Sequence, residues 1–388
     1  MNISQEIESR YSEMIDIRRY MHQHPELSFH ENNTKEYIYK QIKDLGFDIK
    51  RDVGGNGLTA RLQVNDDYPT IALRADFDAL PLEDGKDVPY KSKTPGVMHA
   101  CGHDAHTAML ITTARIMAEH KDELPVNVVF LHQHAEEKIP GGAKSMVEAG
   151  ALDGVDYVYG IHVSSAYPVG MLSYSYGYKH AGADSFTIKV QGSGGHGAAP
   201  HESIDPVVAS ASLIQQLQTI TSRSIDPLKS AVVTAGMFNA GVAFNVIPDS
   251  AEISGTVRTF EKGVKDIVVS RLNGILKGIE SSFNVTCTLD YQDGYPPVLN
   301  DSNEMKRILK CQQDNQYVKE LNEVEPSMGG EDFAYFLQEK PGAFYNIGTQ
   351  NKETGADYPH HHPLFDIDEE GMKAGVESFL KLALNFNK

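Results

Sequence analysis

Several features that place proteins in familiar classes are scarce in this chain. Only three cysteines occur, Cys101, Cys287 and Cys311, and an odd number at such wide spacing is poor material for a disulfide framework. Lysine and arginine total 35 against 53 acidic residues, which gives a net charge of −18. This balance argues against a nucleic-acid-binding surface and leaves no polybasic patch for a membrane. We therefore expect neither nucleic acid nor membrane as a partner.

Uninterrupted apolar runs are also missing. The N-terminal segment MNISQEIESRYSEMIDIRR is charged throughout and lacks the apolar core of a secretion signal. The longest apolar-looking stretch, residues 231–248, is interrupted by residues such as Thr234 and Asn239, which indicates two strands and a turn instead of a membrane span. We expect a soluble, cytoplasmic protein.

The order of apolar patterns predicts two domains. The length of 388 residues exceeds the roughly 250 to 300 at which one hydrophobic core stops growing. Up to about residue 177, short strands alternate with helices, a rhythm typical of an α/β domain with a mostly parallel sheet. The expected elements are a helix that ends before Pro25, helices over 33–45, 103–120 and 142–148, and strands over 69–74, 126–131 and 156–161.

Beyond Gly177 the pattern changes to that of a ferredoxin-like α+β module. Strand, helix, strand, strand, helix and strand are expected over 185–191, 203–222, 231–238, 251–260, 264–280 and 285–290. The chain then returns to helix and strand signals, so the small domain is predicted to be inserted into the large one. The expected domains are a discontinuous catalytic domain, residues 1–177 and 293–388, and an inserted domain, residues 178–292. In the catalytic domain, helices are expected to flank a mostly parallel mixed sheet.

Side chains that bind metals follow the predicted strands of the large domain. Asp76 and Asp78 come after the first strand, Glu136 and Glu137 after the next, and His162 after the last. Ligands of open parallel sheets bind beyond the carboxyl ends of the strands, so these side chains are expected at one rim. The aspartates are candidates to orient metal-bound histidines, with a turn or helix cap as the alternative for Asp76.

The motif HACGHDAH offers two more ligands. Cys101 and His103 share a metal only if they lie on a turn, which Gly102 permits. A helix that begins there would favour a thiolate at Cys101 through its dipole. The alternative for this pair is a buried cysteine beside a surface histidine, and His106, one turn further on, fits a helix-surface residue. No sequence pattern links five other histidines to the predicted metal centre: His22, His24, His99, His132 and His134.

Paired acids beside metal ligands suit water activation. If Glu137 or Glu136 binds a metal, its neighbour can take a proton from bound water as a general base. A solvated surface pair is the alternative for these acids, and a core histidine is the alternative for His162, which ends the apolar run YVYGI. The late run HHH at 360–362 offers a further candidate ligand, and only one of its three rings needs to point toward the metal centre.

Two glycine patterns point only weakly to nucleotides. Gly192, Gly194 and Gly197 fit G-x-G-x-x-G after a strand, but Pro200 follows where a helix should open. The similar pattern at 55–60 leads into a second strand, LTARLQV. Because both lack the strand-turn-helix context, a nicotinamide oxidoreductase is a minor alternative.

A series of longer motifs runs along nearly the whole chain. In order they are RRYMHQHPELSF, RADFDALP, MHACGHDAHTAML, AEEKIPGGA, GIHV, GSGGHGAAPH, DPVVAS, NVIPD, GTVRT, GGEDFAYF, PGAFYNIG and HHPLFDIDEE. Through these motifs the chain resembles the aminoacylase, carboxypeptidase G and hippurate hydrolase family of dinuclear metallo-amidohydrolases, in its N-acyl-amino-acid amidohydrolase branch. The resemblance implies two divalent metals held by Cys101, His103, Glu137, His162 and His361. One metal would take Glu137 and His361, the other His103 and His162, with Cys101 bridging both and Glu136 as the base.

The same resemblance makes the inserted domain a lid and dimerisation module. Its His196, in GGHG, would reach across a homodimer to stabilise the oxyanion, while Asn245 and Arg258 would hold the substrate carboxylate. A turn asparagine and a solvated strand arginine are the structural alternatives. Peptidase-branch relatives carry a histidine in place of Asp76 and an aspartate in place of Cys101, which favours the amidohydrolase branch. That branch usually has phenylalanine, glutamine and proline where this chain reads LHQH, at 131–134.

The expected reaction is hydrolysis of an N-acyl amino acid, such as an N-acetyl amino acid, or of a similar small amide by a metal-activated water. Glu136 would be the general base, and His196 would polarise the carbonyl oxygen. Thiolate and imidazole suit zinc, cobalt or nickel, whereas carboxylate and the resemblance favour manganese. The alternatives are a metallo-dipeptidase, aminopeptidase or carboxypeptidase acting on short peptides, and a non-catalytic binding protein, which the complete ligand set disfavours.

Overall fold

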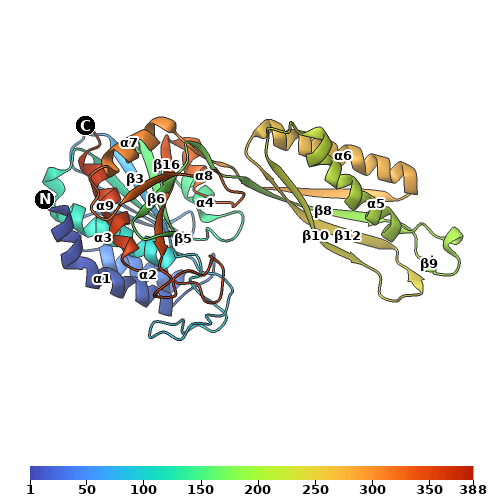
Figure 1. Cartoon of the computed structure of the whole chain (residues 1–388), viewed down its shortest axis with the longest axis horizontal. Coiled ribbons are helices and arrows are strands. Elements are labelled where there is room, and N and C mark those ends of the chain that lie inside the picture. Colours follow the sequence, from blue (N-terminus) through green and yellow to red (C-terminus); the bar gives the residue numbers. More distant parts are fainter. Residues whose placement is uncertain (388) are drawn as a thin grey trace. The chain divides into compact units, whose positions relative to one another are not determined.

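The computed structural model describes residues 1–387, and the chain divides into two compact units (Figure 1). The first unit comprises Met1–Lys179, Val298–Pro326 and the chain from Asp332 onward. The second comprises His180–Pro297 and the short segment Ser327–Glu331. That segment was not expected from the sequence, because it is too short to carry a periodic apolar pattern; it joins the second unit through the hydrogen bond from Ala181 N to Ser327 O, at 3.0 Å.

An eight-stranded mixed sheet runs through the first unit in the order β1-β2-β4-β3-β5-β16-β6-β15. These strands are β1 (Asp48–Val53), β2 (Gly57–Leu62), β3 (Thr70–Asp76), β4 (Asn127–Gln133), β5 (Tyr157–Pro168), β6 (Met171–Tyr174), β15 (Glu320–Glu323) and β16 (Gly342–Gln350). β3 runs parallel to β4 and β5, as do β16 to β5 and β15 to β6. The expected mostly parallel mixed sheet is therefore confirmed.

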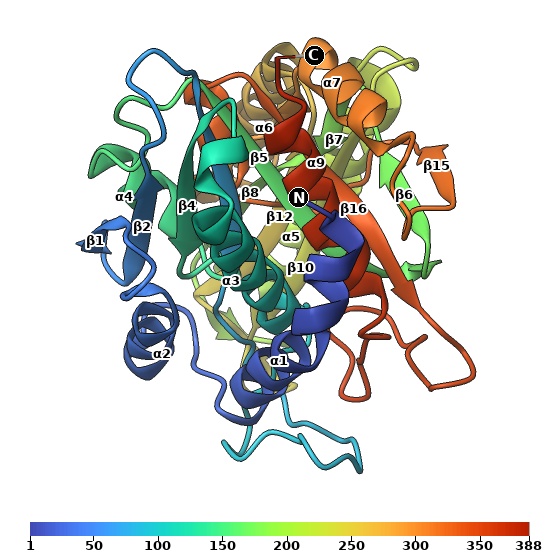
Figure 2. The same ribbon diagram turned by 90° about the vertical axis from the view of Figure 1, so that its left-hand side faces the viewer.

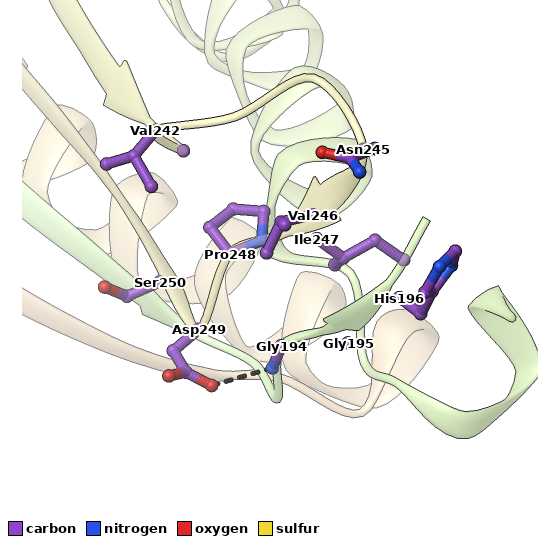
Figure 3. Close-up of a pocket in the computed structure, with 11 residues that line it drawn as sticks. Gly194, Gly195, His196, Val242, Asn245, Val246, Ile247, Pro248, Asp249 and Ser250 are labelled. Atoms are coloured by element: carbon purple, nitrogen blue, oxygen red, sulfur yellow. Dashed lines mark hydrogen bonds between the residues drawn. The ribbon is translucent and has the colours of Figure 1, made fainter. Parts of the chain in front are cut away.

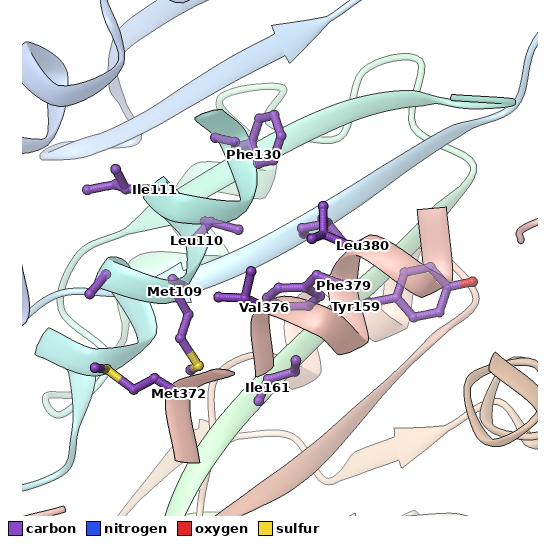
Figure 4. Packing of buried hydrophobic residues seen from close by; sticks show 14 of the residues in the cluster. Met109, Leu110, Ile111, Phe130, Tyr159, Ile161, Met372, Val376, Phe379 and Leu380 are labelled. Atoms are coloured by element: carbon purple, nitrogen blue, oxygen red, sulfur yellow. The ribbon is translucent and has the colours of Figure 1, made fainter. Parts of the chain in front are cut away.

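Helices cover both faces of this sheet. α1 (Ile3–Gln23), α3 (His103–Glu119) and α9 (Gly371–Leu384) lie side by side over one face (Figure 2). There, Met109 of α3 and Phe379 of α9 pack in one core with Ile161 of β5 (Figure 4). Alternate residues of the same strands, such as Ala72 and Val158, pack on the other face with α4 (Gly142–Glu148) and α8 (Ala334–Glu339). Two more helices, α2 (Asn32–Ile42) and α7 (Ser302–Gln312), complete this unit together with the short pair of β7 (Gly177–His180) and β14 (Val298–Asn300).

The second unit is an antiparallel sheet packed against two helices. The sheet order is β10-β12-β8-β13, and β9 pairs with β11 in a separate two-stranded ribbon. The elements are β8 (Gly182–Gln191), β9 (Gly195–His196), α5 (Pro206–Thr219), β10 (Ala231–Ala240), β11 (Val246–Ile247), β12 (Ser250–Thr259), α6 (Lys262–Phe283) and β13 (Thr286–Tyr295). Leu213 of α5 and Leu272 of α6 share a core with Ile188 and Ile253 of the sheet. The strand and helix order is the one predicted. Within residues 1–387 no helix is long and apolar enough to cross a membrane.

A buried ionic cluster ties the N-terminal helix to the C-terminal part of the first unit. Arg18 of α1 is fully buried and lies 2.9 Å from Asp104, 2.7 Å from Asp366 and 3.2 Å from Glu369. Burial alone would lower the pKa of Arg18, but the carboxylates hold it well above its usual value. The guanidinium therefore stays charged and neutralises acids from α3 and from the segment before α9.

Replacing Arg18 by methionine is expected to lower the free energy of unfolding by about 3 to 5 kcal/mol, because the buried carboxylates lose their cation. Denaturant titration measures this change. Arg19→Met is the matched control, since Arg19 also pairs with Glu369 but its side chain is 43% exposed. The control should cost less than about 1 kcal/mol. Equal losses in the two variants would contradict this role of the cluster.

Candidate metal centre

The predicted metal-binding side chains of the first unit converge at the ends of β3 and β4, on β5 and at the start of α3. Asp76 is the last residue of β3, and Glu136 follows β4. The sequence suggested that His162 follows the end of its strand. β5 continues to Pro168, however, so His162 lies within the strand. Gly102, with φ of 92°, caps α3 in the left-handed conformation that lets Cys101 and the helix face the same centre.

Two groups of possible metal ligands share Cys101. The ligand atoms of Cys101, His103 and His162 lie within 4.8 Å of one another, and so do those of Cys101, Glu137 and His361. Cys101 Sγ is 3.5 Å from His162 Nε2, and His361 Nε2 is 3.3 Å from Glu137 Oε1. The structure therefore brings together the five residues named as ligands, in the two expected sets.

Glu136 lies beside these groups. Its Oε2 is 4.0 Å from His103 Nε2, and Glu137 Oε1 is 3.8 Å from the same nitrogen. Glu136 is only 7% exposed. The alternative of a solvated surface pair is therefore wrong, because the loop after β4 turns both acids toward His103.

Asp78 holds the ring of His103. The ring Nδ1 of His103 lies 3.0 Å from the backbone oxygen of Asp78 and 3.1 Å from its Oδ1. These contacts leave Nε2 directed at the ligand groups, which is how carboxylates commonly orient metal-bound histidines. Asp78 itself is buried and also accepts from Ser28 Oγ at 2.7 Å.

Asp76 and His106 form a second buried pair that the sequence did not reveal. Asp76 Oδ1 lies 2.6 Å from His106 Nδ1, and Asp76 Oδ2 accepts from Arg74 at 2.6 Å. His106 is buried and its Nε2 accepts from Val163 N at 2.9 Å. The interpretation of His106 as a surface residue is wrong, because α3 is buried around most of its first three turns. The interpretation of Asp76 as a turn or cap is also wrong, because Asp76 ends the buried strand β3 and its side chain pairs with His106 and Arg74. The spacing of three residues between His103 and His106 was the available signal.

The electrostatics of the centre favour a positive charge among its acids. Burial alone would lower the pKa of His103, but Asp76 and Asp78 raise it to about 10. Desolvation, followed by the charges of Glu137 and Glu136, holds the pKa of the half-buried Cys101 thiol well above its usual value. This is opposite to the thiolate expected from the helix dipole, and a nearby divalent cation would reverse it.

Unpartnered atoms give an independent test of the fit to a metal. His103 Nε2 is buried and has no hydrogen-bond partner among the described residues, and the buried Glu137 Oε1 has the His361 ring 3.3 Å away but no hydrogen bond of good geometry. Such atoms are costly unless an ion or other group satisfies them. Desolvation also holds the pKa of His162 well below its usual value, so its ring is neutral and free to bind a cation. Thiol, imidazole and carboxylate together fit a divalent transition metal.

The other histidines lie outside the two groups that share Cys101. Of the run at 360–362, His360 packs on Phe365 with ring centroids 4.7 Å apart, and His362 stacks on Tyr358 at 4.8 Å. The five unassigned histidines comprise exposed His24 and buried His22, His99, His132 and His134. His134, where the resembled branch usually has proline, lies edge-on to Phe29 at 6.0 Å.

The three predicted substrate-contacting residues belong to the second unit. His196 of β9 and Asn245, which precedes β11, line a pocket of about 640 Å³ (Figure 3). This volume is within the range of small-molecule sites. Arg258 of β12 does not line that pocket; its Nη1 is 3.4 Å from the backbone oxygen of Asp184. Arg258 is half-buried, and its assignment to the substrate carboxylate stays a prediction.

Comparison with known proteins identifies the family of this chain. The model of Peptidase family M20/M25/M40 matches residues 72–385. The N-acetyl-L-cysteine deacetylase of Bacillus subtilis (strain 168) is 40% identical over 362 residues, which cover 93% of this chain and 85% of that protein. Thermostable carboxypeptidase 2 of Saccharolobus solfataricus is 39% identical over 377 residues, which cover 96% of this chain and 95% of that protein.

A solved structure extends the likeness to the whole fold. The crystal structure of the Bacillus subtilis YXEP protein, described as a dinuclear metal binding peptidase, superposes with a TM-score of 0.85 at 34% identity. The match covers 98% of each chain. The chain is therefore an amide-bond hydrolase that belongs to peptidase family M20/M25/M40, in the group of aminoacylases and related amidohydrolases that its motifs resemble.

Proposed function

We propose that this enzyme hydrolyses N-acyl amino acids, N-acetyl amino acids first among them, to a carboxylate and a free amino acid. The observation that carries the proposal is the convergence of two ligand groups on Cys101, with Glu136 beside them. The similarity to an N-acetyl-L-cysteine deacetylase supports the choice of substrate. Small amides of this kind need no extended peptide groove.

Two divalent ions are assigned to the centre, with manganese as the first candidate and zinc, cobalt or nickel as others. Cys101, His103 and His162 would hold one ion, and Cys101, Glu137 and His361 the other. When bound, such ions lower the pKa of water to about 7 and polarise a carbonyl oxygen.

Glu136 is assigned the proton transfers. Its carboxylate takes a proton from the attacking water and returns it to the leaving nitrogen, which therefore departs as an amine. Asp78 keeps the His103 ring in one orientation during these steps, because its backbone oxygen and its Oδ1 both contact His103 Nδ1. Glu136 is only 7% exposed, so its carboxylate is largely shielded from bulk water.

The second unit is assigned the roles of lid and dimerisation module. His196 would donate to the developing oxyanion, and Asn245 and Arg258 would hold the substrate carboxylate. Strand β10 lies at one edge of its sheet, and exposed apolar side chains gather on it and on the loop that follows, including Met237, Phe238, Val242 and Phe244. An open sheet edge beside exposed apolar residues suits pairing with a second copy of the chain.

Mixing two inactive variants tests whether His196 acts across such a dimer. We expect His196→Ala and Glu136→Gln to be inactive as separate preparations. After subunit exchange, the mixed dimer joins an intact Glu136 in one chain to an intact His196 in the other, so activity should return. Light scattering of the separate and mixed preparations tests whether they are dimers. A mixture that stays inactive although subunits have exchanged would contradict the cross-subunit role.

A comparison of substrates tests the proposed function. The manganese-loaded enzyme should show a higher kcat/KM for N-acetyl amino acids than for dipeptides with the same C-terminal residue. The second candidate is peptidase activity, which the similarity to a carboxypeptidase favours. A higher kcat/KM for dipeptides would overturn the first assignment in favour of the second.

A further inference from the structure

A fully buried carboxylate lies behind the loop that carries Glu136 and Glu137. Glu31, which precedes α2, is 0% exposed. Its Oε1 accepts from Phe29 N and from Ala135 N, both at 2.9 Å, and its Oε2 accepts from Asn56 Nδ2 at 2.9 Å. One side chain thus joins three segments that are far apart in the sequence.

The segment held by Glu31 has a strained backbone. Ala135 adopts φ of 51°, in the left-handed region that costs a residue with a Cβ about 1 to 2 kcal/mol. Its neighbour Glu136 is the assigned base, and Glu137 is an assigned ligand. The backbone N–H of Glu137 donates to Asp78 Oδ2 at 3.0 Å. Buried carboxylates therefore hold the backbone on both sides of Glu136.

The position of Glu31 is costly for the protein. Burial, opposed in part by the bond from Asn56, raises the pKa of Glu31 to about 7. The three donors that reach the carboxylate are uncharged, and the cation of Lys35 reaches it only through Asn56, whose Oδ1 accepts from Lys35 Nζ at 3.2 Å. A buried carboxylate without a direct cation is destabilising unless its hydrogen bonds compensate. Those bonds fix the turn at Ala135.

We propose that Glu31 is a positioning residue for the hydrolytic centre: by holding Ala135 in the left-handed conformation, it sets the directions in which Glu136 and Glu137 leave β4. The inference rests on the proposed function for the roles of these two acids. It does not depend on the identity of the substrate. Glu31 touches neither ligand group, so its effect is indirect.

Glu31→Ala tests the proposal through manganese affinity as well as turnover. Removing the acceptor releases Ala135, so Glu137 should bind manganese about 10- to 100-fold more weakly, as measured by calorimetry. At saturating manganese, kcat for an N-acetyl amino acid should fall by about 10- to 100-fold with little change in KM, because Glu136 is displaced.

Glu26→Ala is the matched control. The Glu26 carboxylate also accepts three hydrogen bonds, from Asn33 Nδ2 at 2.7 Å, Thr34 N at 2.8 Å and Thr34 Oγ1 at 2.9 Å, but none comes from the loop after β4. Its loss should reduce stability and leave manganese affinity and kcat close to those of the wild type. Similar affinity and kcat losses in both variants would overturn the positioning role.

A second-site change separates positioning from general stability. Glycine adopts φ near 51° without steric cost, so adding Ala135→Gly to Glu31→Ala should recover part of the manganese affinity and of kcat. No recovery in the double variant would overturn the proposal. If the wild type binds manganese but hydrolyses no amide, the proposed function fails, and the affinity measurements still decide the role of Glu31.

Discussion

Glu136→Gln is expected to lower kcat by about 10²- to 10⁴-fold while both metals stay bound. Glutamine keeps the shape of the side chain but cannot take a proton from water. Glu136 belongs to neither of the groups that share Cys101, so its loss should leave the metals in place. Steady-state kinetics with an N-acetyl amino acid and metal analysis of the same preparation measure the two effects.

Glu148→Gln provides the matched control for this change. Glu148 is an exposed glutamate at the end of α4, so its substitution removes one negative charge away from the ligand groups. It should keep wild-type kcat and metal content. Full activity of the Glu136→Gln variant would rule out Glu136 as the general base. Loss of metal from the same variant would indicate that Glu136 is a metal ligand.

Cys101→Ala is expected to abolish activity and to lower the affinity for both metals. Cys101 is the only residue common to the two ligand groups, so one substitution removes a ligand from each. Metal analysis after dialysis at a fixed free manganese concentration measures the retained ions. Cys287→Ala, in the second unit, is the control and should retain both. Retention of one metal with wild-type affinity would show that Cys101 does not bridge.

The elements with strong local patterns could be predicted from the sequence. α4 begins and ends at the predicted residues, and α3 begins at His103 as expected, because glycines precede both helices and apolar residues recur through them. The succession of strands and helices along the second unit also follows from local apolar patterns. The boundary segment Ser327–Glu331 could not be found in this way, since its place depends on a hydrogen bond to a residue far back in the chain.

The candidate site was only partly accessible to sequence reasoning. The proposed ligands lie in short motifs whose spacing and chemistry indicate metal binding. The buried contacts behind them join distant segments: Arg74 pairs with Asp332 at 3.1 Å, and Glu31 reaches Ala135 at 2.9 Å. Desolvation and the neighbouring acids raise the pKa of Cys101, which opposes the effect expected from the helix dipole, and no sequence pattern indicated these buried neighbours.

Anomalous diffraction from crystals grown with manganese tests the central claim most directly. The account predicts two manganese peaks in each chain, one contacted by His103 and His162 and the other by Glu137 and His361, with Cys101 Sγ bound to both. A single peak, or peaks that leave Cys101 unbound, would contradict it.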